Sequence, residues 1–562
     1  MNFQKHQSQF FHRTLVIFII LISSIHQLQS QIENVPIENQ VYEFLNRLGV
    51  KGILKLYSNT MIPLSRKEVA ELLKEVEAQR DNLTDAEVEF FEKFKREFVH
   101  EFASETEDVQ GLFNDGNVNT MVSDKEKYLY TYPDTTFSLY LEFIGSVKHQ
   151  RVNGDGFGSS QASFETHGAR VRGTIKRKFG YFIQATNGTF FGDRLLALSD
   201  SKLRGNVKFK DLNAPYFDFT EAYIRADLDW FNVQFGREFQ AVGTGYSGRF
   251  ILSDHAPVFD FLKIDARYRS LRFIYLHGSL LGDSVLFPGI QNPEPPGSNK
   301  YFALHRLQIS LFNLLNFGIS EMVIYRRFTP EFAYLNPINF FKSSEHSLRD
   351  RDNAFLNFDL ELFPVSGVKW FGSLLVDDID FSKIGTGWWG NELGWQSGLY
   401  MTDLMGLPDL DGVIEYARIE PYVYTHRYFD NNYSNNNIGV GHHLEPNSDE
   451  WFIQVNYRPT KKLRSWLTYS GIRHGDNIMV NGQVVKNVGG NILQGHRAID
   501  GEYVRFLDGN LTRRDRYQIQ LTYEFINNFF VTGRFELHQQ KFYATSQKVT
   551  DRHMSIQFQI EY

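Results

Sequence analysis

The last stretch of the chain, residues 513–562, alternates between apolar and polar side chains. In residues 517–525, Tyr, Ile, Leu, Tyr and Phe alternate with Gln, Gln, Thr and Glu. A period of two places the apolar side chains on one face of a β-strand and the polar ones on the other. The pattern recurs in residues 529–538 and 554–562. The end of the chain therefore predicts three consecutive amphipathic strands.

The final residue, Tyr562, lies on the apolar face of the last predicted strand. An aromatic residue in this place resembles the C-terminal sorting signal of bacterial outer-membrane proteins. We therefore predict a transmembrane β-barrel, in which one strand face meets lipid and the other lines the lumen. A water-soluble all-β protein is the alternative.

The alternation extends upstream to Phe137 and indicates about 18 antiparallel strands, most of them near the length that crosses hydrocarbon at a tilt. Short links alternate with long polar segments, as expected for periplasmic turns and extracellular loops. The short links include 178–180, 267–270, 313–316, 364–367, 459–461 and 527–528. The long segments are 153–163, 190–216, 240–257, 281–299, 327–353, 381–390, 426–449, 475–512 and 541–551.

The first thirty residues have the layout of a secretory signal peptide. Lys5 and Arg13 precede the apolar run 15–22, and small and polar residues follow up to Ser30. This apolar run is too short to span a bilayer. We expect residues 1–30 to be removed.

The next region, residues 31–125, is predicted to be a small helical domain on the periplasmic side, ahead of a barrel at 126–562. Ser65 to Glu68 and Thr84 to Glu87 both have the spacing of a capping box, which opens a helix. Gly49 predicts the end of an earlier helix. The apolar faces of these helices predict packing between the helices or against the barrel.

Composition agrees with this assignment. Aromatic residues make up 15% of the chain although mean hydropathy is −0.35, and the aromatic girdles of a membrane barrel need such an excess. The chain has no cysteine, so disulfides are excluded. Removal of the signal peptide takes away two cations and changes the net charge from −7 to about −9. Nucleic acid is not an expected partner.

The segment 416–426 illustrates how strand faces are assigned. We assign Arg418 and Glu420 to the lumen, together with the tyrosines that alternate with them, because a charge on the lipid face is costly. Ala417 and Ile419 are then assigned to lipid. The charge network predicted to brace the barrel wall or narrow the pore consists of Arg418, Glu420 and Glu524.

Aromatic and polar residues at the outer rim form the predicted binding surface. A sugar ring offers an apolar C–H face and a ring of hydroxyls, which suit an aromatic platform beside planar hydrogen-bonding groups. An aromatic girdle is the alternative role for the tryptophan pair. The predicted glycan-binding residues are Tyr246, Trp388, Trp389, Tyr424 and His426.

Motifs for other chemistry have simpler explanations. Residues 243–248 match G-x-G-x-x-G, but the motif opens no helix and follows no βαβ unit, so dinucleotide binding is not predicted. The aspartates of 377–380 could hold calcium, and His442 with His443 could hold a metal, but neither group has a complete ligand pattern. Ser253 and His255 lack a third member of a catalytic triad. We predict no catalytic residue, cofactor or metal.

Short segments that share a known pattern follow one another over most of the chain. They are 41–45, 63–73, 235–237, 251–257, 335–337, 352–354, 377–378, 415–418, 424–426, 439–442 and 446–449. Together they resemble the Wzi-like capsule assembly family. Two departures are Val242 to Gly245, where an aromatic-Gly-Pro-Gly pattern is expected, and the double histidine at 442–443.

The resemblance implies an 18-stranded outer-membrane barrel with a periplasmic helical bundle. It also implies a surface lectin that attaches or organises capsular or exported polysaccharide without catalysis. The expected partners are this polysaccharide, outer-membrane lipid and, during biogenesis, the barrel-assembly machinery. A porin-like channel for small polar solutes is the alternative, because a barrel of this size can leave an aqueous lumen.

Overall fold

The computed structural model describes residues 31–102, 109–115, 123, 125–134, 136–210, 212–282 and 299–562. The predicted signal peptide, residues 1–30, lies outside this range, as does most of the predicted loop 281–299.

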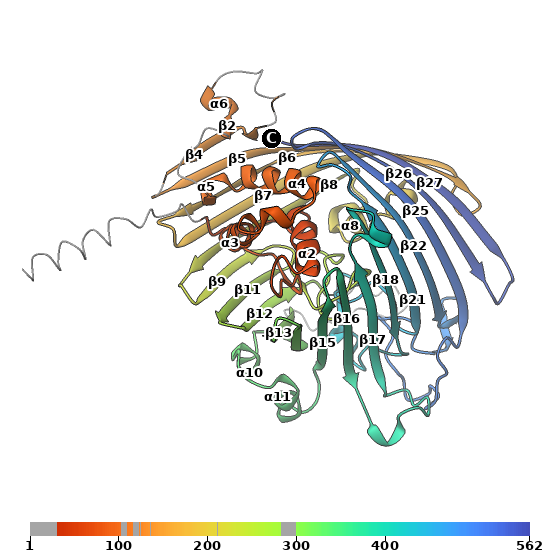
Figure 1. Ribbon diagram of the computed structural model, residues 1–562. Coiled ribbons are helices and arrows are strands. Elements are labelled where there is room, and N and C mark those ends of the chain that lie inside the picture. Colours follow the sequence, from red (N-terminus) through yellow and green to blue (C-terminus); the bar gives the residue numbers. More distant parts are fainter. Residues whose placement is uncertain are drawn as a thin grey trace, which may run out of the picture.

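Eighteen antiparallel strands close into one barrel (Figure 1), which confirms the predicted fold class. Neighbours in sequence are neighbours in the sheet, as short hairpin connections require. The strands are β5 (Ser138–Gly154), β6 (Gly158–Ile175), β7 (Phe179–Gly192), β8 (Tyr216–Asp227), β9 (Phe231–Arg237), β11 (Asp260–Tyr268), β12 (Leu271–Leu280), β13 (Asn299–Leu311), β14 (Leu315–Arg327), β15 (Asn353–Val365), β16 (Val368–Asp378), β17 (Glu392–Met401), β18 (Leu410–Ile419), β21 (Ser448–Tyr457), β22 (Leu463–Asp476), β25 (Asn510–Ile526), β26 (Phe529–Phe542) and β27 (Lys548–Glu561).

The barrel closes between its last and first long strands. β27 pairs with β5 from Asp551 opposite Gly154 to Glu561 opposite Ile144. The backbone N–H of Tyr562 adds a hydrogen bond of 2.7 Å to the carbonyl of Phe143. The C-terminal alternation therefore belongs to the strand that seals the sheet.

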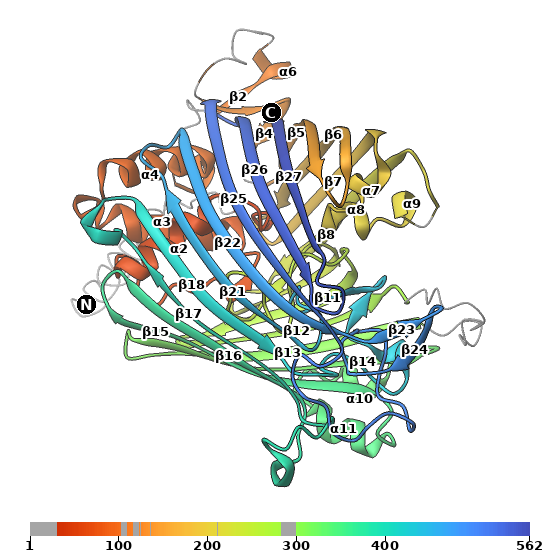
Figure 2. The same cartoon turned by 90° about the vertical axis from the view of Figure 1, so that its right-hand side faces the viewer.

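The two ends of the barrel differ. One end, here the turn end, carries tight links such as 527–528; the other, the loop end, carries the long connections. Two predicted long loops are wrong, because β5 and β6 are joined by residues 155–157 and β26 and β27 by residues 543–547. Figure 2 shows these strands side by side with β25 as one tall wall.

The helices of the N-terminal region lie within the turn end of the barrel (Figures 1 and 2). Among the described residues, no helix has the length and apolar character needed to cross a membrane. The helices of this region are α2 (Val41–Lys51), α3 (Arg66–Glu77), α4 (Asp85–Glu97) and α5 (Val99–Phe102). The remaining helices and short strands are β1 (Met61–Ile62), β2 (Val109–Gly111), α6 (Leu112–Asp115), β3 (Glu126–Tyr128), β4 (Tyr130–Pro133), α7 (Arg194–Ala197), α8 (Ser201–Arg204), α9 (Val207–Lys210), β10 (Ala241–Val242), α10 (Phe332–Leu335), α11 (Phe341–Ser347), β19 (Ser434–Asn435), β20 (Ile438–Gly439), β23 (Ile478–Val480) and β24 (Gln483–Lys486).

Both predicted capping boxes are present. The Ser65 and Thr84 hydroxyls accept hydrogen bonds from the backbone N–H groups of Glu68 and Glu87, whose side chains bond back to the cap residues. The predicted stop at Gly49 is wrong: α2 continues to Lys51 and ends at Gly52, whose φ of 80° favours glycine. Gly49 is instead the place where the helix packs against another segment, because an added Cβ would lie 3.0 Å from Cβ of Tyr57.

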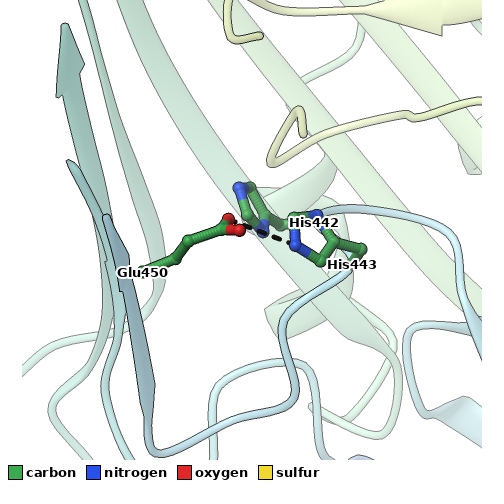
Figure 3. Close-up of side chains that lie close together, drawn as sticks. All are labelled: His442, His443 and Glu450. Atoms are coloured by element: carbon green, nitrogen blue, oxygen red, sulfur yellow. Dashed lines mark ion pairs between the residues drawn. The ribbon is translucent and has the colours of Figure 1, made fainter. Parts of the chain in front are cut away.

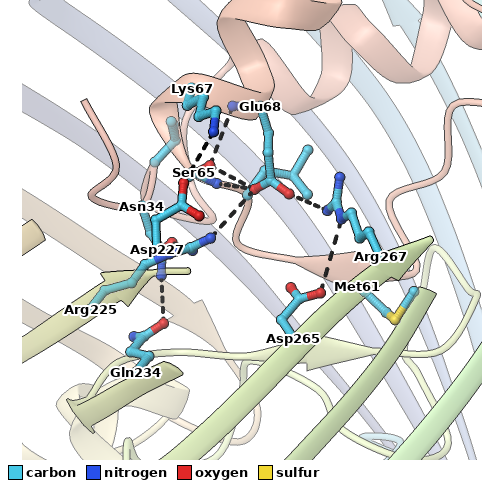
Figure 4. Close-up of polar contacts among 12 residues, drawn as sticks. Asn34, Met61, Ser65, Lys67, Glu68, Arg225, Asp227, Gln234, Asp265 and Arg267 are labelled. Atoms are coloured by element: carbon cyan, nitrogen blue, oxygen red, sulfur yellow. Dashed lines mark hydrogen bonds and ion pairs between the residues drawn. The ribbon is translucent and has the colours of Figure 1, made fainter. Parts of the chain in front are cut away.

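The N-terminal residues 31–102, here the helical segment, are held to one wall of the barrel by polar contacts with β8, β9 and β11 (Figure 4). Lys67 lies 3.1 Å from Asp227. The Asn34 amide donates to Gln234 at 3.0 Å, and the Glu68 carboxylate forms an ion pair with Arg267. In addition, β1 pairs with β10, which follows β9 in the chain.

A buried ion cluster holds the same segment to the opposite wall. Arg47 of α2 is 2% exposed and lies 2.7 Å from Glu87 of α4. Its guanidinium also pairs with Asp411 of β18, which is fully buried, and with Asp403 at 2.5 Å. Because a buried charge is costly unless it is paired, this cluster ties the position of α2 to the barrel wall.

The outward faces carry the apolar positions of the predicted alternation. In β25 these side chains are well exposed, as are Met554, Ile556 and Phe558 in β27. The alternate positions face inward, and Glu524 forms a 2.6 Å ion pair with Lys93 of α4. The outward residues of β25 are Tyr517, Ile519, Leu521, Tyr523 and Phe525.

The predicted facing of β18 is wrong. Ala417 and Ile419 are fully buried in the interior core, while Arg418 lies opposite the outward Trp395 and pairs with Glu420 at 2.6 Å. Arg418 is level with an aromatic cluster, in which the ring of Tyr416 is 5.1 Å from Trp395. At the height of an aromatic girdle an outward charge costs little, so the penalty used to assign the lumen face does not decide the facing there.

The predicted strand also ends earlier than expected. β18 stops at Ile419, and both Tyr422 and Tyr424 have left-handed backbones, with φ of 66° and 70°. The strict alternation expected through His426 is therefore broken.

We expect Arg47→Met to lower the free energy of unfolding by about 3–5 kcal/mol, because it removes the central cation of the buried cluster and leaves Glu87 with Lys51 and Asp411 with Arg458 as their remaining partners. Urea unfolding in detergent micelles measures the loss. Arg80→Met is the matched control, since Arg80 and its partner Glu92 are 43% and 38% exposed, and an exposed pair contributes at most about 1 kcal/mol. Equal effects of the two changes would contradict the structural role of the cluster.

We expect Leu467→Arg to destabilise the barrel by roughly 2–4 kcal/mol in lipid vesicles, because Leu467 is 57% exposed on the lipid face. Thr468→Arg places the same side chain on the inward face, where Thr468 lines a polar cavity. Its expected cost is below about 1 kcal/mol. Unfolding titrations of both variants test the facing; a larger loss for Thr468→Arg would reverse it.

Candidate functional site

The two predicted rim tryptophans lie together in the connection between β16 and β17. Trp388 and Trp389 have ring centroids 5.7 Å apart, and both are partly exposed. Trp389 stacks on His496 at 3.9 Å with nearly parallel rings, and Lys383 lies 3.9 Å above Trp388. The structure thus brings two of the five candidates into one aromatic group at the loop end.

Tyr424 and His426 lie in the connection between β18 and β21. Tyr424 is fully buried, and its hydroxyl donates to the carbonyl of Phe250 at 2.8 Å. It therefore offers no surface to a polymer, contrary to the prediction. His426 is partly exposed, and its Nδ1 accepts a hydrogen bond from the Tyr428 N–H at 3.1 Å. Burial lowers the pKa of His426 to about 4, so it is neutral at physiological pH.

Tyr246 lies inside the lumen, not at the outer rim as predicted. Its ring stacks on Tyr400 at 5.4 Å, and its hydroxyl accepts a hydrogen bond of 2.9 Å from Asn46 of α2. Its backbone N–H donates to Glu415 of β18 at 2.8 Å. The connection between β9 and β11 therefore folds inward and places Tyr246 between the helical segment and the space above it.

That space is a polar cavity of about 530 Å³, here the loop-end cavity. It follows the inner faces of β21, β22, β25, β26 and β27 from the middle of the barrel toward the loop end. The residues that line it combine aromatic rings with amide, hydroxyl, imidazole, guanidinium and carboxylate groups. They include Phe157, Tyr246, His443, Glu450, Phe452, Gln454, Thr468, Ser470, Arg514, Arg516, Gln518, His538, Gln540 and Asp551.

Paired charges set the polar character of the cavity wall. Glu536 of β26 lies 2.7 Å from both Arg516 and His538. Arg516 also donates to Gln518 at 2.8 Å, and the Gln454 amide donates to Thr468 at 3.1 Å. These neighbours fix the orientation of donors and acceptors along the wall, so the cavity is organised before a ligand arrives.

Two histidines and a glutamate meet at one edge of the loop-end cavity (Figure 3). His443 Nε2 is 3.2 Å from Glu450 Oε2, and the rings of His442 and His443 are 4.6 Å apart. Burial lowers the pKa of His442 well below its usual value. Burial also acts against a charge on His443, but the nearby Glu450 carboxylate outweighs it and raises the pKa of His443.

A second cavity of about 570 Å³ lies at the turn end, between the helical segment and the same wall. It is lined by Arg464 and Arg534 from the wall and by Lys93 from α4. Arg534 donates to Gln520 at 3.0 Å. The wall therefore carries polar groups along its whole inner face.

The aspartates of 377–380, which the sequence offered as a possible calcium site, each accept a backbone hydrogen bond. The Asp377 carboxylate accepts the Tyr424 N–H at 2.7 Å, Asp378 accepts the Ile379 N–H at 2.9 Å, and Asp380 accepts the Ser382 N–H at 3.0 Å. Asp378 and Asp380 thus hold their own turns, and Asp377 holds the backbone of the connection between β18 and β21.

Sequence reasoning missed most of the loop-end cavity. Residues such as Gln454, Arg516 and His538 are the polar members of ordinary alternating strands, and the barrel has many such positions. The local signals were Tyr246 and the double histidine at 442–443. The rest becomes a site only because the inward loop at Tyr246 leaves space beside one particular wall.

Comparison with solved structures finds a protein with a similar fold. The barrel is similar to the structure of Wzi, an outer membrane protein involved in group 1 capsule assembly in Escherichia coli, with a TM-score of 0.55 and 12% identity over 94% of this chain and 99% of that one. A BenF-like porin from Pseudomonas fluorescens matches with a TM-score of 0.43 and 7% identity, over 75% of this chain and 99% of the porin. Pseudomonas aeruginosa OccK5 matches with a TM-score of 0.42 and 9% identity, over 75% of this chain and 98% of OccK5. A search of curated proteins finds no match.

A family model supports the assignment. The model described as capsule assembly protein Wzi matches residues 119–551, which covers most of the barrel. Together with the closed barrel, this match assigns the protein to the bacterial outer membrane. The chain therefore belongs to the capsule assembly protein Wzi family.

Proposed function

We propose that this protein binds capsular or exported polysaccharide noncovalently and holds it at the cell surface. The observation that carries the proposal is the loop-end cavity, which lies within a barrel of the Wzi family. The similar Escherichia coli protein is described as a carbohydrate-binding β-barrel. A cavity that combines aromatic rings with oriented hydrogen-bonding groups has the chemistry that sugar rings need.

The proposed orientation places the loop end outside the cell and the turn end in the periplasm. Short turns on the periplasmic side and longer connections outside are the rule for these barrels. Residues 31–125 then form a periplasmic helical domain, although α2 to α5 enter the barrel instead of hanging below it. Outer-membrane lipid would contact the exposed apolar faces, and the barrel-assembly machinery would recognise the strand that ends at Tyr562.

Two surfaces contribute to binding in this proposal. The loop-end cavity, with Tyr246 at its inner edge, would take one segment of the polymer. The pair Trp388 and Trp389 would offer a second, weaker contact outside it. Many weak contacts along a repeating polymer add up to firm attachment. Tyr424 would support the inward loops, and His426 would act at the rim as a neutral hydrogen-bonding group.

The proposal is for binding and not catalysis. Ser253 Oγ accepts a hydrogen bond from the Arg249 N–H at 3.1 Å. Burial, with a smaller effect of His443, lowers the pKa of His255 to about 4, which makes His255 a weak base at neutral pH. The alternative of an open channel fits less well, because the helical segment lies across the turn end of the lumen.

Filling the loop-end cavity tests the proposal. Gln454→Trp puts a large side chain into the cavity, and we expect at least a tenfold fall in cell-associated polysaccharide with a matching rise in the medium. The matched control is Ile453→Trp, because the neighbouring Ile453 is 39% exposed on the lipid face. Extracted polysaccharide in the cell and medium fractions is the measurement.

The level of folded barrel in the outer membrane must be equal for both variants. Normal retention by Gln454→Trp cells would exclude the cavity as the binding site. A double variant, Trp388→Ala with Trp389→Ala, tests the rim separately, and we expect a smaller, severalfold loss. Normal retention by the double variant would remove those two residues from the proposal and leave the cavity untouched.

A further inference from the structure

We infer that His442, His443 and Glu450 form a binding site for a divalent transition metal of the zinc type, at the edge of the loop-end cavity. One ligand atom from each of the three residues lies within 4.8 Å of the other two (Figure 3). Two of these atoms, His443 Nε2 and Glu450 Oε2, are 3.2 Å apart. This spacing is close to that between neighbouring ligands of a tetrahedral metal.

The ligand set selects the metal. Two imidazole nitrogens and one carboxylate oxygen suit zinc and its neighbours, whereas calcium and magnesium prefer oxygen ligands alone. If all three atoms were 4.8 Å apart, each would have to move inward by about 0.7 Å to reach the usual zinc distances. Side-chain rotation supplies a movement of this size.

Glu450 supplies a second observation that points to a cation. It is 2% exposed, and its Oε1 accepts a 2.5 Å hydrogen bond from Ser470. Its Oε2 is paired with the His443 ring nitrogen at 3.2 Å. A buried carboxylate is costly unless a cation neutralises it, and a metal ion held by Glu450 and His443 would take over this role from the protonated ring.

The neighbours of the two histidine rings determine which ring nitrogens can bind a metal. The Ser247 backbone lies next to the His443 ring and contributes to the raised pKa of His443. A polar neighbour of this kind orients a ligating histidine. His442 Nε2 lies 3.3 Å from the Ser247 hydroxyl, and its Nδ1 accepts the Leu444 N–H at 3.2 Å. Coordination through Nε2 would move the ring proton to Nδ1 and replace the contact with Leu444.

Three protein ligands leave a fourth position of a tetrahedral metal open. His443 lines the loop-end cavity, so that position faces the space proposed for polysaccharide. The metal would there bind water or, if the proposed function holds, a hydroxyl or carboxylate oxygen of a sugar. The metal site itself does not depend on that function, since it rests on the three side chains alone.

Zinc binding by the purified full-length protein tests the inference. The protein in detergent micelles is stripped with a chelator, dialysed and titrated with zinc chloride by calorimetry, and zinc retained after desalting is measured by atomic emission. We expect one zinc ion per chain. His443→Gln and Glu450→Gln should each weaken zinc binding at least about 100-fold, since each removes a direct ligand.

The matched control is His346→Gln. Glu345, His346 and Asp350 form the other group with metal-ligand spacing among the described residues, but two of its three members are exposed, against one, His443, in the proposed site, and Glu345 pairs with Lys342 at 3.1 Å. We expect this variant to bind zinc as the unchanged protein does. Heat stability and barrel mobility on unboiled gels confirm that every variant is folded.

Three outcomes would overturn the site. The first is the failure of the unchanged protein to retain zinc at tenfold molar excess. The second is full zinc retention by folded His443→Gln or Glu450→Gln protein, and the third is loss of zinc retention in His346→Gln protein. None of these measurements uses polysaccharide, so their result is independent of the retention assay.

Discussion

Closure of the sheet between β27 and β5 is the contact on which the rest of the molecule depends. Inside a bilayer no water replaces a missing backbone hydrogen bond, so an open sheet edge would cost several kcal/mol for each unpaired group. The last residues of the chain must therefore return to the first long strand. Once the ring is closed, every strand has one face toward lipid and one toward a lumen of fixed width.

The lumen is then filled from both ends. The helical segment occupies the turn end and is tied to the wall by buried ion pairs such as Arg47 with Asp411. Inward connections, including the one that carries Tyr246, pack against β18 and its neighbours. The wall from β21 to β27 is left partly uncovered, and the polar positions that membrane alternation assigns to the inside become the lining of a cavity.

The sequence predicts the barrel well because alternation is a local property that lipid on one side enforces. The prediction fails at positions that do not contact lipid. Residues 153–163 and 541–551 are rich in polar residues and lack a regular apolar alternation, so strands that continue beyond the membrane resemble loops. Arg418 and Glu420 were assigned to the lumen because a charge that faces hydrocarbon is costly, but this cost becomes small at the height of the aromatic girdle. The cavity was not predictable, because it depends on the pairing of strands distant in sequence and on the path of inward loops.

Tyr246 is shared by the two fillings of the lumen. Its hydroxyl contacts α2, its ring contacts the wall, and the same side chain borders the loop-end cavity. A displacement of this ring would therefore change both the shape of the cavity and the hydrogen bond to Asn46. The inner edge of the cavity is thus only as well positioned as the helix on which Tyr246 rests.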